Sequence, residues 1–250
     1  MYQDCISLFF KFRKRVFLLV GLALFNFLLG DSSGLNVLLL PVYFLAWAWL
    51  SLGAYEAFLN PQQGPETFNL TRLARFSLFQ FAIILAAGVG AALAMLIVLF
   101  PALLIVFAIL GESNPDLAEA IVYMLGFISA VVAVLIVLPL IGTMVPAWIS
   151  HGEIDLKKAI ERGRSQHLNI IKVLVRGPGV TSIVSAVFIF INSSWFMTGF
   201  WRDLSILNLP GLFLVVSTTV VLAFGEILLA WVFARAFQIT DDTPEPDLLH

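Results

Sequence analysis

The chain has 250 residues, of which 60% are hydrophobic and only 12% are charged. A soluble domain averages about 45–50% apolar and about 25% charged residues, so this composition predicts a membrane protein. The formal net charge of -2 leaves no basic surplus for binding the phosphate backbone of a nucleic acid. The single cysteine, Cys5, excludes an internal disulfide.

Uncharged runs predict six membrane spans, because a helix needs about 20 mainly apolar residues to cross a hydrocarbon core of about 30 Å. We expect an all-α fold, a polytopic membrane protein with six transmembrane helices and short amphipathic interfacial helices. A single membrane domain, 1–237, should be followed by a disordered acidic tail, 238–250. The predicted spans are about 16–30, 35–57, 76–100, 120–145, 179–201 and 211–237. A secretory signal peptide is the alternative interpretation of the first run.

Two uncharged runs, 76–111 and 120–152, are long enough to hold hairpins of two short spans each. The basic residues argue against hairpins, because cytoplasmic loops carry the excess of lysine and arginine. With one crossing per run, every basic residue except Arg202 lies on one side. We therefore expect six crossings with both termini in the cytoplasm. Prolines such as Pro101 and Pro139 should bend the long helices.

The segment 154–176 has the pattern of an amphipathic helix lying in the membrane interface. Its apolar positions recur at steps of three or four: Leu156, Ile160, Gly163, His167, Ile171 and Leu174. Its basic residues are expected to contact lipid headgroups or a membrane-protein partner: Lys157, Lys158, Arg162, Arg164, Lys172 and Arg176. A plain solvated loop is the alternative. The sequence Gly177-Pro178-Gly179 is expected to break the chain before the fifth span.

A resemblance can be named from the aliphatic run that ends in Pro101, the turn Val145-Pro146-Ala147 and the polar segment 155–165. Over about residues 90–180 the chain resembles YciC-like bacterial inner-membrane proteins. It also resembles the membrane domain attached to some glycerophosphodiester phosphodiesterases. Those families often have aliphatic-Pro-Gly-Ile at a span end, where this chain has Ala102 in place of the glycine. The resemblance implies a six-helix fold in the bacterial inner membrane, without an established activity.

Polar residues inside the spans are the candidates for a substrate or proton pathway, because ionisable groups are costly in hydrocarbon. Glu226 lies near the centre of the sixth predicted span, and the first four spans look nearly free of polar features. The predicted polar seam comprises Glu226, Asn192, Ser193, Thr218 and Thr219. The alternative is a structural role, in which Glu226 hydrogen-bonds a neighbouring helix.

Two further features have local predictions. Glu56, near the end of the second span, is expected to pair with Arg72 or Arg75 or to reach the headgroups. Small residues are dense in the third span, and pairs such as Gly88 with Ala92 allow close helix packing. We expect that packing to lie inside the monomer, with a homodimer or partner contact as the alternative.

No pattern of catalytic or metal-binding residues occurs. None of the three histidines lies within a predicted span, and no phosphate-binding loop is present. We therefore expect no enzyme activity, no metal and no cofactor, and membrane lipids or a membrane-protein complex as partners. The predicted function is an accessory or assembly subunit of the membrane. The alternative is a small-solute or lipid translocator organised around Glu226.

Overall fold

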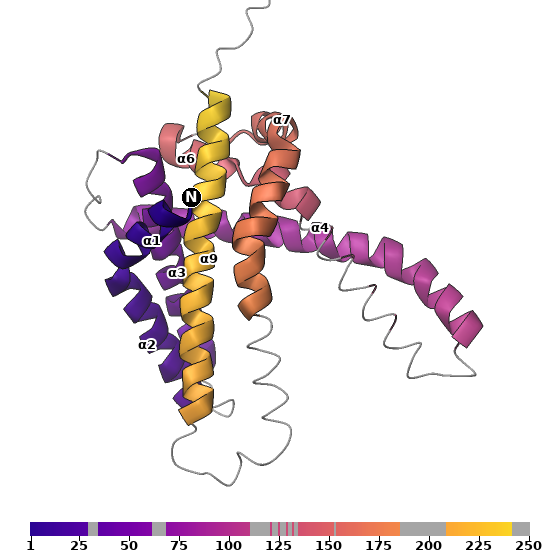
Figure 1. Ribbon diagram of the computed structural model, residues 1–250, viewed down its shortest axis with the longest axis horizontal. Coiled ribbons are helices and arrows are strands. Elements are labelled where there is room, and N and C mark those ends of the chain that lie inside the picture. Colours follow the sequence, from indigo (N-terminus) through magenta and orange to yellow (C-terminus); the bar gives the residue numbers. More distant parts are fainter. Residues whose placement is uncertain are drawn as a thin grey trace, which may run out of the picture.

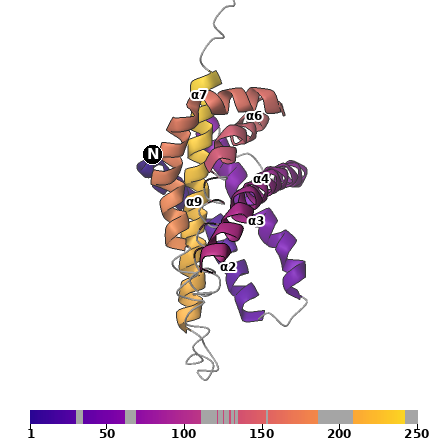
Figure 2. The ribbon, with the colours of Figure 1, turned by 90° about the vertical axis from the view of Figure 1, so that its right-hand side faces the viewer.

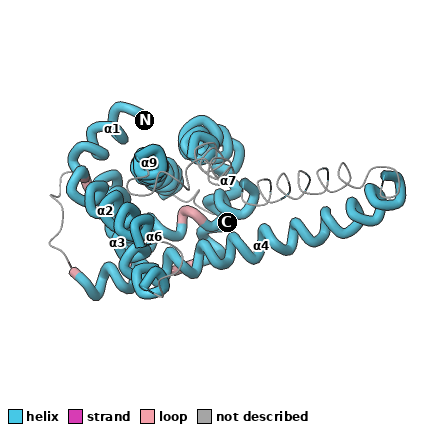
Figure 3. Tube along the Cα trace, turned by 90° about the horizontal axis from the view of Figure 1, so that it is seen from below, coloured by secondary structure: helices cyan, strands magenta, loops and turns pink. Residues whose placement is uncertain are grey.

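The computed structural model shows an all-helical chain throughout the residues that it describes (Figures 1 and 3). The described residues are 1–29, 35–61, 69–110, 121, 125, 129, 132, 135–152, 154–185 and 209–241. Three described helices are long and apolar enough to cross a membrane, over Leu39–Leu59, Leu70–Gly90 and Gly211–Asp241. The prediction of a helical chain is confirmed for these residues, and the three helices fit the membrane protein that the composition predicts.

The N-terminal segment forms two helices, α1 (Tyr2–Lys11) and α2 (Arg13–Leu29). One face of α1 is buried through Cys5 and Leu8, while its other side chains are mainly exposed. The α2 helix packs against the helices α3 (Leu35–Leu59) and α9 (Leu209–Asp241), with Leu19 fully buried. The first predicted span is therefore part of the helical body.

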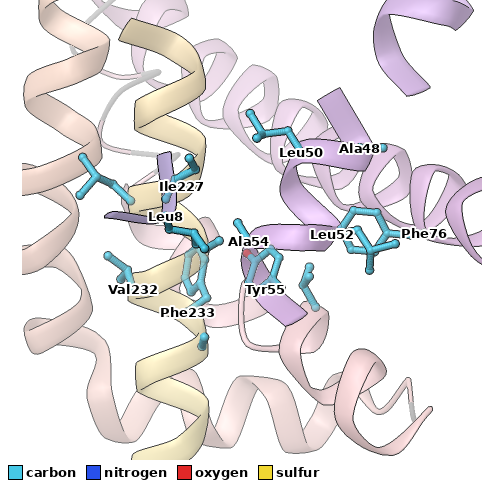
Figure 4. Close-up of a cluster of buried hydrophobic side chains, with 14 of the residues drawn as sticks. Leu8, Ala48, Leu50, Leu52, Ala54, Tyr55, Phe76, Ile227, Val232 and Phe233 are labelled. Carbon is cyan, nitrogen blue, oxygen red and sulfur yellow. The ribbon is translucent and has the colours of Figure 1, made fainter. Parts of the chain in front are cut away.

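The core forms where α3 and α9 pack side by side with α1 and α2 around them. Apolar residues on α9 such as Ile227 and Phe233 are buried against Ala54 and Tyr55 of α3 (Figure 4). The α9 helix continues to Asp241, beyond the predicted end of the sixth span at Phe237. Residues 238–241 of the expected tail are thus helical, and 242–250 lie outside the described residues.

The first long uncharged run is one continuous helix, α4 (Leu70–Leu110), rather than a hairpin. Asn69 caps its N-terminus, because its side-chain oxygen accepts a hydrogen bond from the Arg72 backbone N–H at 3.1 Å. The helix passes through Pro101 without ending. It runs across α9 and leads away from the other labelled helices (Figures 1 and 3).

The second long run is helical at 135–141, turns at Gly142 and Thr143, and continues as α6 (Met144–His151). The next helix, α7 (Leu156–Leu174), begins at Asp155, whose side chain accepts a hydrogen bond from the Lys158 backbone N–H. Most of the run's remaining residues, from 120 to 134, lie outside the described part. Figure 2 shows α6 and α7 near the end of α9.

The chain does not break at Gly177-Pro178-Gly179, contrary to the prediction. It forms one π-helical turn, η1 (Val175–Gly179), and stays helical through 180–185. Proline lacks an N–H group, and a π-bulge is a local way to keep a helix continuous around such a gap. The Thr181 and Ser182 hydroxyls donate hydrogen bonds to the Pro178 carbonyl, at 2.8 and 2.9 Å. Beyond 185, the fifth predicted span lies outside the described residues.

Candidate functional site

A polar cluster joins three helices around Glu226, which lies near the middle of the candidate span on α9. The Gln80 side-chain N–H group, on α4, donates to Glu226 Oε1 at 3.1 Å and to Ser51 Oγ at 3.3 Å. The Ser51 hydroxyl, on α3, also hydrogen-bonds Glu226 and is fully buried. We call these three residues the polar cluster. Their hydrogen bonds connect α3, α4 and α9 at one point.

Other polar groups lie close to the polar cluster, but not all of them have a described hydrogen-bond partner. Tyr55, one turn after Ser51 on α3, is buried and interacts electrostatically with Glu226. Gln80 Oε1 is enclosed, and no described group donates a hydrogen bond to it. Ser77 Oγ, one turn earlier on α4, is likewise enclosed and has no hydrogen-bond partner among the described groups. An enclosed acceptor without a donor is costly and calls for an explanation.

The predicted polar seam is only partly within the described chain. Asn192 and Ser193 lie outside the described residues. Thr219 is buried, but its hydroxyl donates to the Val215 carbonyl of its own helix at 2.8 Å. Thr218 is half-buried on the neighbouring position of α9. The described partners of Glu226 therefore come from α3 and α4 rather than from the seam residues on α9.

Gln80 and Ser51 were not among the predicted site residues. The expectation that the first four spans lack polar features is wrong, because both residues lie in these spans and contact Glu226. A signal for them was present, since a glutamine inside a membrane span is the kind of residue that hydrogen-bonds across helices. What the sequence could not supply was which helix faces α9.

An ion pair lies where α3 ends and α4 begins. Arg72 forms an ion pair with Glu56 at 3.2 Å, which confirms one of the two partners expected for Glu56. The Arg15 guanidinium donates to the Trp49 carbonyl and lies 4.5 Å from the centre of the Trp49 ring. Trp49 is therefore in contact with Arg15.

The C-terminal end of α9 reaches the same region. The Gln238 side chain donates to the Phe58 carbonyl at 3.1 Å, so α3 and α9 end side by side. The His151 imidazole lies 3.1 Å from Asp241 Oδ2. We call this end of the molecule, marked by the pairs Glu56–Arg72 and His151–Asp241, the charged end.

The amphipathic segment forms the helix α7, and one face of this helix is buried within the protein. Ala159, Gly163, Ile170 and Leu174 are the buried positions. A Cβ on Gly163 would lie 2.5 Å from the Pro139 carbonyl oxygen, so the two backbones are in close contact. Of the expected apolar stripe, Gly163 and Leu174 are thus packed inside the protein, whereas Leu156 is exposed.

Most basic residues of α7 and η1 are exposed. Five are exposed: Lys157, Lys158, Arg164, Lys172 and Arg176. Arg162 is half-buried, with its guanidinium 5.2 Å from the centre of the Phe237 ring on α9. The predicted contact surface therefore separates into an exposed basic part and one arginine that packs on α9.

Cys5 is fully buried on α1, and burial raises the pKa of its thiol to about 12. Lipid attachment and other modification need an accessible thiolate. The described conformation therefore favours an inert structural cysteine.

Comparison of the chain with known protein families, characterised proteins and solved structures finds no match.

Proposed function

We propose that the chain is a non-catalytic integral protein of the bacterial inner membrane with six spans and both termini in the cytoplasm. In this proposal it acts as an accessory or assembly subunit that binds lipid and a membrane-protein partner. One observation supports the proposal most strongly. The α4 helix leads away from the helical body and exposes large apolar side chains along much of its length, among them Leu78, Leu85, Ile97 and Leu104.

Such a surface must be covered by lipid tails or by helices of another protein. Part of it also has the spacing for close contact. A Cβ on Gly88 would meet no described atom within 4 Å, and Ala92 is exposed one turn later. Gly90, by contrast, packs against Val137 inside the chain. The expected internal packing thus applies to Gly90, while the pair Gly88 and Ala92 remains open.

Affinity purification of the full chain in mild detergent tests the partner. The double variant Gly88→Leu with Ala92→Leu adds bulk where the chain has space, so it should fold and lose the co-purifying protein. The matched control is Gly21→Leu on α2, where a Cβ would also meet no described atom within 4 Å. It should retain the partner. A natural chain that purifies alone, or a double variant that keeps its partner, would contradict the proposal.

The exposed basic residues of α7 and η1 support the lipid-binding part of the proposal. Basic residues beside an anionic membrane surface contribute about 1 kcal/mol each. They lie on a helix whose end joins the start of the fifth predicted span, so they are close to the headgroups in the six-span arrangement. Anionic lipid that stays bound during purification is the expected observation.

A translocator organised around Glu226 is the second candidate, and the polar cluster favours it. Polar groups from three helices meet inside apolar segments, which is common along substrate and ion pathways. Glu226→Gln should then abolish transport into liposomes at unchanged protein level. The accessory role predicts no transport by the natural chain.

A further inference from the structure

Glu226 lies inside a candidate membrane span, and no basic residue among those described forms an ion pair with it. An ionised carboxylate in the middle of a membrane span costs about 2.5–3.5 kcal/mol even on a lenient insertion scale. Among the described side chains, Glu226 has hydrogen bonds from Gln80 and Ser51 and no ion pair. These two partners are neutral.

The side-chain carbonyl oxygen of Gln80 lacks a hydrogen-bond donor among the described groups. Its amide N–H group is fully used, donating to Glu226 and Ser51, while its carbonyl oxygen Oε1 is enclosed without a described donor. The oxygen and nitrogen of one amide are bonded to the same carbon, so Oε1 belongs to the amide group whose nitrogen already donates to Glu226. A protonated carboxyl group has the missing donor, whereas a carboxylate has none.

We propose that Glu226 binds one proton and that this proton is donated to Gln80 Oε1. The Gln80 N–H group donates to Glu226 Oε1 and the Glu226 O–H group donates back, which makes a cyclic acid–amide pair. The pair satisfies the enclosed oxygen and removes the charge in one step. It holds α4 against α9 and does not depend on the accessory role proposed above.

Among the residues that the structure describes, the ionisable groups on the helices named below do not form an ion pair with Glu226. From α3 the Tyr55 phenol interacts electrostatically with Glu226, and Glu56 is paired with Arg72 at the charged end. From α1 the only buried ionisable group is the neutral Cys5 thiol. Arg15 of α2 interacts with Glu56. On η1, the Arg176 side chain is exposed, and its backbone carbonyl accepts a hydrogen bond from the Tyr2 hydroxyl.

Loss of the proton would place a carboxylate beside the Gln80 carbonyl oxygen, so one hydrogen bond would become a repulsion. The unfolded chain leaves this carboxyl ionised at neutral pH. The folded state then binds one proton more than the unfolded state, so stability falls as the pH rises. The contact between α4 and α9 should weaken first.

Infrared spectroscopy of the purified full chain tests this directly, because a protonated carboxylic acid has its own C=O stretching band. At about pH 7 the natural chain should show the band, and Glu226→Gln should remove it. Two glutamines can still form a cyclic pair, so this variant should fold. Its melting temperature should vary less with pH than that of the natural chain, which should fall between about pH 6 and about pH 9.

The exchanged double variant, Gln80→Glu with Glu226→Gln, is the matched control. It reverses the acid and the amide, so it should restore both the band and the pH-dependent melting. A natural chain whose band is unchanged by Glu226→Gln would show that Glu226 is ionised and would overturn the proposal. Loss of the band when Na⁺ replaces choline at fixed pH would also overturn it, since the site would then hold a metal cation.

Discussion

Arg15 occupies space that only a glycine at position 53 leaves open. A Cβ on Gly53 would collide with the Arg15 guanidinium, which is bonded to the Trp49 carbonyl and lies over the Phe12 and Trp49 rings. Contacts of a cation with an aromatic ring are worth about 0.5–2 kcal/mol, and a hydrogen bond from a charged group about 1.5–3 kcal/mol. A single methyl group at position 53 therefore competes with several favourable contacts.

Gly53→Ala should lower the thermal stability of the protein, with a net loss on the order of 1 kcal/mol. The loss of Arg15 contacts exceeds the gain of about 1 kcal/mol in helix propensity. Thermal unfolding in detergent measures it, with Gly21→Ala as a control that should be neutral or stabilising. In an Arg15→Gln background the same Gly53→Ala change should no longer destabilise. If Gly53→Ala is equally harmful there, Arg15 is not the cause.

Residue identity was enough to predict some of these contacts. Glu226 stands out as an acid within an apolar run, and Glu56 has few basic residues near it in the sequence, so its pairing with Arg72 could be expected. Gln80 and Ser51 could not be assigned to Glu226 in the same way. That assignment depends on the rotation of α3 and α4 about their axes, which is decided by packing over the whole helix rather than by the local sequence.

At the scale of elements, the length and position of α7 were predictable but its environment was not. Apolar spacing predicts a helix, and a cap at Asp155 begins it. Periodicity does not reveal whether an apolar face meets lipid or protein. The deciding contact is the close approach of Gly163 to the backbone at Pro139 and Leu140, together with the hydrogen bond from the Thr143 hydroxyl to the Ala159 carbonyl.

Gly163→Ala should separate α7 from the helix at 135–141, because the new Cβ would lie 2.5 Å from a backbone oxygen that cannot move independently. Overpacking of this kind costs about 1–3 kcal/mol. We expect a lower melting temperature and faster proteolysis within 151–176. The control is Arg164→Ala, an exposed position on the same turn, which should change stability by no more than about 0.5 kcal/mol. Equal behaviour of the two variants would show that α7 is not anchored through Gly163.

At the scale of the whole molecule, α4 differs most from a bundle of parallel spans. Its 41 residues are about 60 Å long, whereas the hydrocarbon core is about 30 Å thick. A helix of that length keeps its apolar surface in the membrane only if it is strongly tilted, as excess hydrophobic length generally requires. The slant of α4 relative to α9 agrees with this requirement (Figures 1 and 3). The uncharged run predicted the excess length, while the direction of tilt depends on contacts with α3 and α9.

The charged end brings together segments that the basic residues predict to be cytoplasmic. Arg72 meets Glu56 there, and α3 and α9 end side by side through Gln238 and Phe58. A reporter active only in the cytoplasm should therefore work when fused after Arg75, after Arg176 or at the end of the chain. It should be silent near Ser113 and Leu207, in the loops predicted on the other side. The continuous α4 leaves no room for a second crossing between Arg75 and Leu110. A reporter active at Ser113 would mean that α4 does not cross the membrane, and the six-span arrangement would be wrong.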